Sequence, residues 1–156
     1  MKKYDHTTDW FYEGNVSKTI VSHLRNANYN ITKDNSDKIR ARGEDIIATK
    51  NGVDLIVEVK GYPTEFHTKG KDKGKKKGTD PKLQAKHWFS EVIFCTMTNY
   101  TKHRGRKIEL GLGLPNNERY HELVKKVKPF FIDKKLDIKI FFVDKLGKVT
   151  VEQLSS

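Results

Sequence analysis

Apolar residues alternate along two short runs near the middle of the chain, residues 45–50 and 53–60, with Asn51-Gly52 between them. Alternation over this length is typical of β-strands. Asn-Gly is the dipeptide that best accepts the positive φ angles of a two-residue type I′ turn, so the pattern predicts a β-hairpin. One side of this hairpin is apolar and is expected to face a core: Ile46, Ala48, Val53, Leu55, Val57 and Val59.

Helical and extended patterns alternate along the rest of the chain. Apolar residues spaced three to four apart predict helices over residues 9–28 and 80–98, and a third helix that Pro129 is expected to kink or end. Strands are expected at 107–114 and 136–143, followed by a last short extended segment. The 156 residues therefore predict one domain of the α/β (α+β) class, a mixed β-sheet flanked by helices.

The second predicted helix has clear boundary signals. Thr79 or Asp80 is a good N-cap, and Pro81 stands at the first helical position. Residues 98–106 after the helix are expected to form a polar loop that carries Arg104 and Arg106, two candidate phosphate contacts. The buried side of the helix is expected to consist of Leu83, Trp88, Phe89, Val92 and Phe94.

Charged residues interrupt the second side of the predicted hairpin at its open end. If Lys50 faces Val53, counting back along both strands places Asp45 opposite Glu58, with Cβ atoms about 5 Å apart, and alternation puts Lys60 on the same side. Two carboxylates held together in a buried place repel each other and lose hydration, so they need a cation. Mg²⁺ fits, because it is usually held by one or two carboxylates with water and a substrate phosphate.

A plainer explanation of these charges stays open. Asp45 and Lys60 could form a surface ion pair at the open end of the hairpin, with Glu58 solvated beside them. The polar stretch at 34–42 is expected to be irregular or a short edge segment. It carries Arg40 and Arg42, which either contact a phosphate or are solvated.

Asp45, the hairpin and Glu58-Val59-Lys60 resemble the PD-(D/E)XK nuclease superfamily, although Glu44 stands where that superfamily often has proline. Segments 10–16, 57–63 and 85–89 resemble a group of uncharacterised bacterial proteins with the same fold. The resemblance implies a restriction-endonuclease-like core. It also implies a Mg²⁺-dependent endodeoxyribonuclease, with Mn²⁺ as a possible substitute, that hydrolyses DNA with a metal-activated water.

The resemblance also implies roles for individual residues. Asp45 and Glu58 would be the metal ligands, and Lys60 would assist attack on the phosphodiester. A glutamate on the first helix, by position Glu13, would join the site, although a first-turn glutamate is equally explained by the helix dipole. Gln84 would correspond to a helical glutamine that some members place near the catalytic lysine.

The charge of the chain points to a polyanionic partner. Its 31 basic and 20 acidic residues leave a net charge of +11, with a pI near 9.6, so DNA is the expected partner. The segment 66–79 holds six lysines against one aspartate, which is +5 of this total, and it is rich in glycine. It predicts a mobile loop that contacts DNA phosphates, unless it only aids solubility. These lysines are Lys69, Lys71, Lys73, Lys75, Lys76 and Lys77.

The remaining composition narrows the setting. Cys95 is the only cysteine, so the sequence predicts neither a disulfide nor a disulfide-linked partner, and a reducing cytoplasm is the expected location. No apolar run approaches the roughly 20 residues of a membrane span.

A homodimer would allow two sites to cut both strands. Two other functions stay open: a catalytically inactive nucleic-acid-binding module on the same fold, and a toxin-like or structural RNA-binding protein.

Overall fold

A two-residue turn at Asn51 and Gly52 joins β2 (Ile46–Lys50) to β3 (Val53–Val59) in the computed structural model, which describes residues 4–37 and 42–156. Both turn residues have positive φ, 53° and 74°, as a type I′ turn requires. Lys50 pairs with Val53, and Ile46 pairs with Val57. The predicted hairpin and its register are therefore confirmed.

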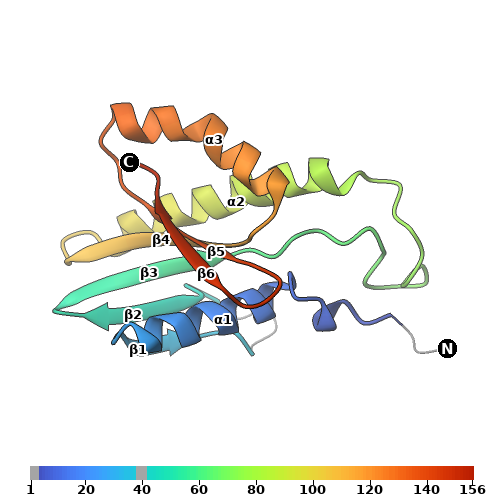
Figure 1. The fold of residues 1–156 in the computed structure, drawn as a ribbon, viewed down its shortest axis with the longest axis horizontal. Helices are drawn as coiled ribbons and strands as arrows, with labels where there is room; N and C mark the ends of the chain where they lie inside the picture. Colours follow the sequence, from blue (N-terminus) through green and yellow to red (C-terminus); the bar gives the residue numbers. More distant parts are fainter. Residues whose placement is uncertain (1–3, 38–41) are drawn as a thin grey trace.

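The sheet extends from this hairpin on both sides (Figure 1). β1 (Asn30–Asp34) pairs with β2 in antiparallel orientation, and β4 (Ile108–Pro115) runs parallel to β3. β5 (Lys139–Val143) is parallel to β4, and β6 (Val149–Gln153) is antiparallel to β5. The described residues thus form the expected mixed sheet, with six strands in the order of the chain. β1 was not predicted as a strand.

Helices cover both faces of the sheet (Figure 1). α1 (Glu13–Asn26) packs on the face formed by Leu55, Val57 and Val59 of β3. α2 (Pro81–Lys102) and α3 (Glu118–Asp133) pack together on the opposite face. Because side chains alternate along a strand, β3 sends its odd-numbered apolar residues toward α1 and turns Glu58 to the side of α2.

The helix boundaries differ from the prediction at several points. α1 begins at Glu13, four residues later than expected, because a short 3₁₀ helix at His6–Thr8 and a turn occupy the preceding chain. α2 is capped by Asp80 as predicted, but it continues to Lys102 through most of the expected polar loop. α3 continues past Pro129 to Asp133, because Phe131 anchors its last turn in the core.

The buried side of α2 also differs in part from the prediction. Phe89 and Val92 are buried as expected, but Leu83 and Phe94 are 51% and 65% exposed. Thr96 and Asn99 are buried instead, because the helix crosses the sheet so that its later turns lie against β3 and β4. A helical spacing of apolar residues alone could not distinguish these two faces.

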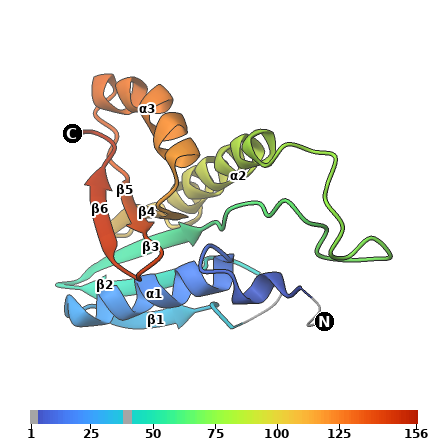
Figure 2. The ribbon, with the colours of Figure 1, turned by 45° about the vertical axis from the view of Figure 1, so that its right-hand side comes forward.

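The basic arm, residues 66–79, projects from the body of the molecule between β3 and α2 (Figure 2). Backbone hydrogen bonds cross it, from His67 N to Lys75 O and from Lys77 N to Glu65 O. These bonds give the arm a folded-back shape, and the prediction that it is mobile stays a prediction. Within the described parts of the chain, no helix combines the length and apolar character that crossing a bilayer requires.

Candidate active site

Asp45 and Glu58 meet at the open end of the hairpin, where their carboxyl groups interact directly. Asp45 comes one residue before β2, and its Oδ2 accepts a hydrogen bond of 2.8 Å from the backbone N–H of Val59. This bond fixes Asp45 against the end of β3. Asp45 and Glu58 are therefore neighbours, as predicted.

Burial makes both acids weaker than ordinary carboxylic acids. It raises the pKa of Glu58 to about 7, and the charge of Asp45 adds to this effect, while a hydrogen bond from Asn99 opposes it. Burial also raises the pKa of Asp45, against the hydrogen bond from Val59 N–H and the charge of Lys60. Near neutral pH the pair therefore retains a proton unless a cation compensates its charge.

Lys60 lies one residue beyond the end of β3, on the same side as Glu58. Its ammonium group is 3.2 Å from the carboxylate of Glu91 and 5.7 Å from the centre of the Trp88 ring, both on α2. The Lys60 side chain is only 19% exposed. Its charge lowers the pKa of both Asp45 and Glu13, so the ammonium group lies within electrostatic reach of both acids.

Glu13 joins this group because α1 begins directly beside the end of β3. A Cβ atom at Gly61 would lie 2.6 Å from the carbonyl oxygen of Phe11 and 2.8 Å from the backbone nitrogen of Glu13, so only glycine allows this approach. Burial raises the pKa of Glu13 to about 7, against the charge of Lys60 and with added repulsion from Asp45 and Glu91. We call Asp45, Glu58, Lys60 and Glu13 the acid–lysine cluster.

Gln84 lies in the first turn of α2, where its Oε1 accepts a hydrogen bond of 3.3 Å from Lys77 of the basic arm. The α2 residues that contact Lys60 are Trp88 and Glu91, one and two turns further along the helix. The structure therefore connects Gln84 to the arm.

The two groups of predicted DNA contacts lie in different places. The arm lysines are mostly exposed, although Lys75 is 3.0 Å from Asp72 and Lys76 is 3.9 Å from Glu65. Arg106 is 2.7 Å from Asp54, near the turn of the hairpin. Four residues along β3 separate Asp54 from Glu58, roughly 13 Å.

Arg106 therefore lies at the far end of the strand from the cluster. Arg104 is exposed beyond the end of α2. Arg42 is exposed, and Arg40 lies outside the described residues.

Asn99 is a site residue that the sequence did not reveal. Its side-chain amide is buried and donates a hydrogen bond of 2.8 Å to Oε1 of Glu58. An asparagine in a helix carries no sequence signal for such a role. Its position follows only from how α2 lies on the sheet.

Glu44, beside Asp45, forms a second ionic group that was not predicted. Its side chain is 4% exposed, and it contacts Lys33, Lys102 and His103. Burial opposes its ionisation, but the hydrogen bonds from Lys102, His103 and Lys33 prevail and hold the pKa of Glu44 well below its usual range. Glu44 therefore ties the chain just before Asp45 to β1 and to the end of α2.

A divalent cation at this site would depend on the two facing carboxylates. In the chain from 4 to 37 and from 42 onward, no three His, Cys, Asp or Glu side chains are grouped so that they could hold a metal together. Mg²⁺ does not need such a group, since water and substrate phosphate often complete its coordination. Asp45 and Glu58 fit Mg²⁺ because two partly buried carboxyl groups with raised pKa values are stabilised in their ionised form by a cation.

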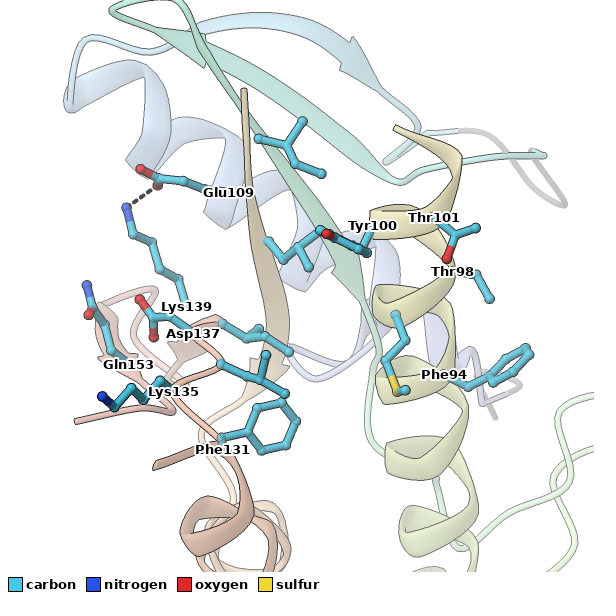
Figure 3. Close-up of a pocket in the computed structure, with 15 residues that line it drawn as sticks. Phe94, Thr98, Tyr100, Thr101, Glu109, Phe131, Lys135, Asp137, Lys139 and Gln153 are labelled. Carbon is cyan, nitrogen blue, oxygen red and sulfur yellow. Dashed lines mark hydrogen bonds and ion pairs between the residues drawn. The ribbon is translucent and has the colours of Figure 1, made fainter. Parts of the chain in front are cut away.

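Among the described residues, two large grooves open on the surface, besides a smaller hollow of about 230 Å³ lined in part by Tyr12 and Lys18. One, of about 780 Å³, is lined in part by Phe11 and Tyr62, which stand two residues along the chain from Glu13 and Lys60; its described lining contains none of the four cluster residues. The other, of about 840 Å³, lies between α2 and the segment that joins α3 to β5 (Figure 3). Its described lining is mainly apolar and contains none of the predicted site residues.

A scan against models of known protein families gives no match for this chain, and a search of curated proteins gives none either.

Proposed function

We propose that this protein is a metal-dependent endonuclease that hydrolyses phosphodiester bonds in DNA. The observation that carries this proposal is the placement of Asp45 beside Glu58, both partly buried and both with raised pKa values, with Lys60 within electrostatic reach of Asp45. A structural ion pair would not need two adjacent carboxyl groups in such a place. A site for a divalent cation would.

Asp45 and Glu58 would hold Mg²⁺, or Mn²⁺ in its place. When bound, the ion would supply an activated water and neutralise charge on the phosphoryl group. The N–H of Val59 orients Asp45, and the amide of Asn99 orients Glu58, so both carboxylates are held in place before substrate arrives.

Lys60 and Glu13 would supply the remaining functions. The Lys60 ammonium would stabilise negative charge that develops on the phosphate, after exchanging the exposed carboxylate of Glu91 for substrate. Glu13, with a pKa of about 7, can both accept and donate a proton near neutral pH. It therefore suits proton transfer at the attacking water or the leaving oxygen.

DNA as the substrate follows from charge. The net charge of +11 and the exposed lysines of the basic arm favour a polyanion. The arm also lies close in the chain to the site, because β3 carries Glu58, Lys60 follows β3 directly, and the arm begins six residues after Lys60. These lysines offer phosphate contacts without base readout, so they would provide affinity and not sequence choice. A homodimer that cuts both strands and a cytoplasmic location belong to the same proposal.

The restriction-endonuclease-like fold is also part of the proposal. The mixed sheet with helices on both faces, and a catalytic hairpin at its centre, support it. The PD-(D/E)XK resemblance rests on Asp45, Glu58 and Lys60, and these residues lie together in space.

A catalytically inactive nucleic-acid-binding module is the second candidate. One observation favours it: Lys60 is already engaged by Glu91 and Trp88, and Glu58 by Asn99, so the site is internally satisfied. Such a module would bind DNA through the arm and would be indifferent to EDTA.

Cleavage of plasmid DNA in Mg²⁺ and in EDTA distinguishes the two candidates. For a nuclease, Asp45→Ala and Lys60→Ala should each lower the Mg²⁺-dependent rate by about 10²-fold or more, while DNA binding in EDTA stays near that of the wild type. Asp54→Asn is the matched control, since Asp54 lies on the same strand at its far end. Full activity in both site variants would refute the assignment.

A further inference from the structure

The groove of about 780 Å³ beside the acid–lysine cluster has an unusual lining. It brings together the N-terminal segment, the chain after β3, the end of the basic arm and the start of α2. Its volume lies in the range of pockets that hold a small organic ligand. Phe11 is two residues before Glu13, and Tyr62 is two residues after Lys60, so the groove opens next to the cluster.

Aromatic rings form much of this groove. Trp10, Phe11 and Tyr62 follow one another edge to face, with ring centroids 5.8 and 6.5 Å apart. Tyr4 and Phe66 form a second pair, with centroids 5.3 Å apart. All five rings are at least partly exposed. Flat ligands stack on such rings.

Lysines lie on the rim of the same groove, namely Lys76, Lys77 and Lys82. The acids in the lining are already engaged: Asp9 accepts a hydrogen bond from the Tyr4 hydroxyl, Asp80 caps α2, and Glu65 lies near Lys76. Lys76 lies 3.9 Å from Glu65 and Lys77 donates to Gln84, and a phosphate would take the place of these partners. The groove therefore offers flat apolar surfaces with lysines at the edge. This combination fits a planar group attached to phosphate.

We propose that this groove binds an unpaired nucleotide, with the base against Trp10 and Phe66 and the adjoining phosphates against the rim lysines. The bases of a duplex have their faces covered by their neighbours, whereas an unpaired base can stack on an aromatic side chain. The inference rests on the proposed nuclease function and narrows its substrate to DNA with a single-stranded part next to the cut. The groove and the cluster would then hold consecutive parts of one strand.

Binding in EDTA tests the groove without any cleavage. A short oligodeoxythymidine and an abasic strand of the same length carry equal charge, but only the first has bases. We expect the thymidine strand to bind about tenfold more tightly, which corresponds to about 1.4 kcal/mol. Equal affinity for the two strands would overturn the proposal.

Variants locate the effect. Trp10→Ala and Phe66→Ala should each reduce the preference for the thymidine strand severalfold and leave the affinity for the abasic strand unchanged. Phe94→Ala is the matched control, because Phe94 is an exposed aromatic residue that lines the other groove. A preference that survives both groove variants would also overturn the proposal.

Tryptophan fluorescence gives a second measurement. The chain has two tryptophans, so Trp10 is the only one left in a Trp88→Phe background. Addition of the thymidine strand should quench its emission, and addition of the abasic strand should not. Quenching by neither strand would contradict stacking on Trp10.

The two proposals can fail separately. If the protein is not a nuclease, the thymidine preference is still expected in EDTA, but no substrate is cut. If the groove proposal is wrong, duplex DNA with an unpaired branch is cut no faster than fully paired duplex, and Trp10→Ala changes neither rate.

Discussion

The side-chain amide of Asn99 donates a hydrogen bond of 2.8 Å to Oε1 of Glu58, and this bond joins α2 to the acid pair. Asn99 is 6% exposed, so the interaction is shielded from solvent. It favours the ionised form of Glu58 against the effect of burial. A residue of the helix therefore lowers the pKa of a residue on the strand, although burial keeps that pKa above its ordinary value.

Asn99→Ala should move the pH profile of cleavage to higher pH. Loss of the amide donor removes a contact that lowers the pKa of Glu58, so the pKa should rise above about 7. The buried acid also loses its partner, at a cost of about 1–3 kcal/mol in unfolding free energy. Rates from pH 6 to 9 and urea denaturation measure both effects. Thr98→Ala, at an exposed neighbour, should change neither, and an unmoved profile in Asn99→Ala would contradict this role.

Mg²⁺ should stabilise the protein against heat at high pH and much less at low pH. The folded-state pKa of Glu58 and of Glu13 is about 7, above the ordinary 4.5, so stability falls as pH rises from roughly 4.5 through 7. A cation that binds the ionised acids reverses this loss. At a concentration 100 times Kd we expect a Tm increase of roughly 5–10 °C near pH 8.

Thermal unfolding with Mg²⁺, and with K⁺ at equal ionic strength, checks this prediction. Asp45→Asn should abolish the increase, whereas Asp54→Asn should keep it. An equal shift in Asp45→Asn would place the bound ion elsewhere.

Glu44→Gln should destabilise the fold at neutral pH by about 2 kcal/mol, the size expected for hydrogen bonds between charged groups. The folded-state pKa of Glu44 is lowered, so its contribution is complete above the unfolded value near 4.5 and is lost as pH falls below it. Urea denaturation near pH 7 and near pH 3 should therefore show a smaller difference between variant and wild type at the lower pH. A difference that is constant with pH would exclude the ionised carboxylate as its source.

Gly61→Ala should separate α1 from the end of β3. The added Cβ would lie 2.6 Å from a backbone oxygen of Phe11, and a backbone cannot yield as a flexible side chain does. We expect a loss of about 1–3 kcal/mol in stability, together with reduced cleavage, because Glu13 moves with the helix. Gly78→Ala is the control, since a Cβ there meets no atom within 4 Å. Wild-type activity in Gly61→Ala would argue against a role for Glu13.

Replacing Lys69, Lys71 and Lys73 with glutamine should weaken DNA binding and reduce its salt dependence. Each phosphate contact that is lost lowers the slope of log K against log salt by about 0.9 on duplex DNA, so the triple variant should lose up to about 2.7. Fluorescence anisotropy over a salt series measures the slope. An unchanged slope would show that the arm is not the contact surface. A control with the same change of charge removes three exposed lysines elsewhere: Lys125, Lys126 and Lys145.

The hairpin of β2 and β3 could be predicted because its signals are local. Asn51-Gly52 determines the turn, the turn determines the register, and the register brings Asp45 to Glu58. β1 could not be predicted in this way, since its residues alternate weakly and its pairing with β2 shifts register between Ile31 and Lys33.

Contacts between segments that are distant in the chain could not be predicted from the sequence either. The ionic group around Glu44 joins Lys33, Lys102 and His103 from three parts of the chain. Asn99 reaches Glu58 only because α2 continues beyond its predicted end at residue 98. Tertiary packing determines both groups of contacts, and no short sequence motif indicates how the elements pack.

α2 supplies the partners of three charged side chains. Glu91 of α2 contacts Lys60, Asn99 contacts Glu58, and Lys102 contacts Glu44. A single residue inserted between Glu91 and Asn99 would rotate everything after it by about 100° and remove the last two contacts together. Insertions and deletions should therefore be tolerated in the basic arm, whereas within α2 they should disrupt the site. The arm is accordingly the better place to graft a new recognition segment.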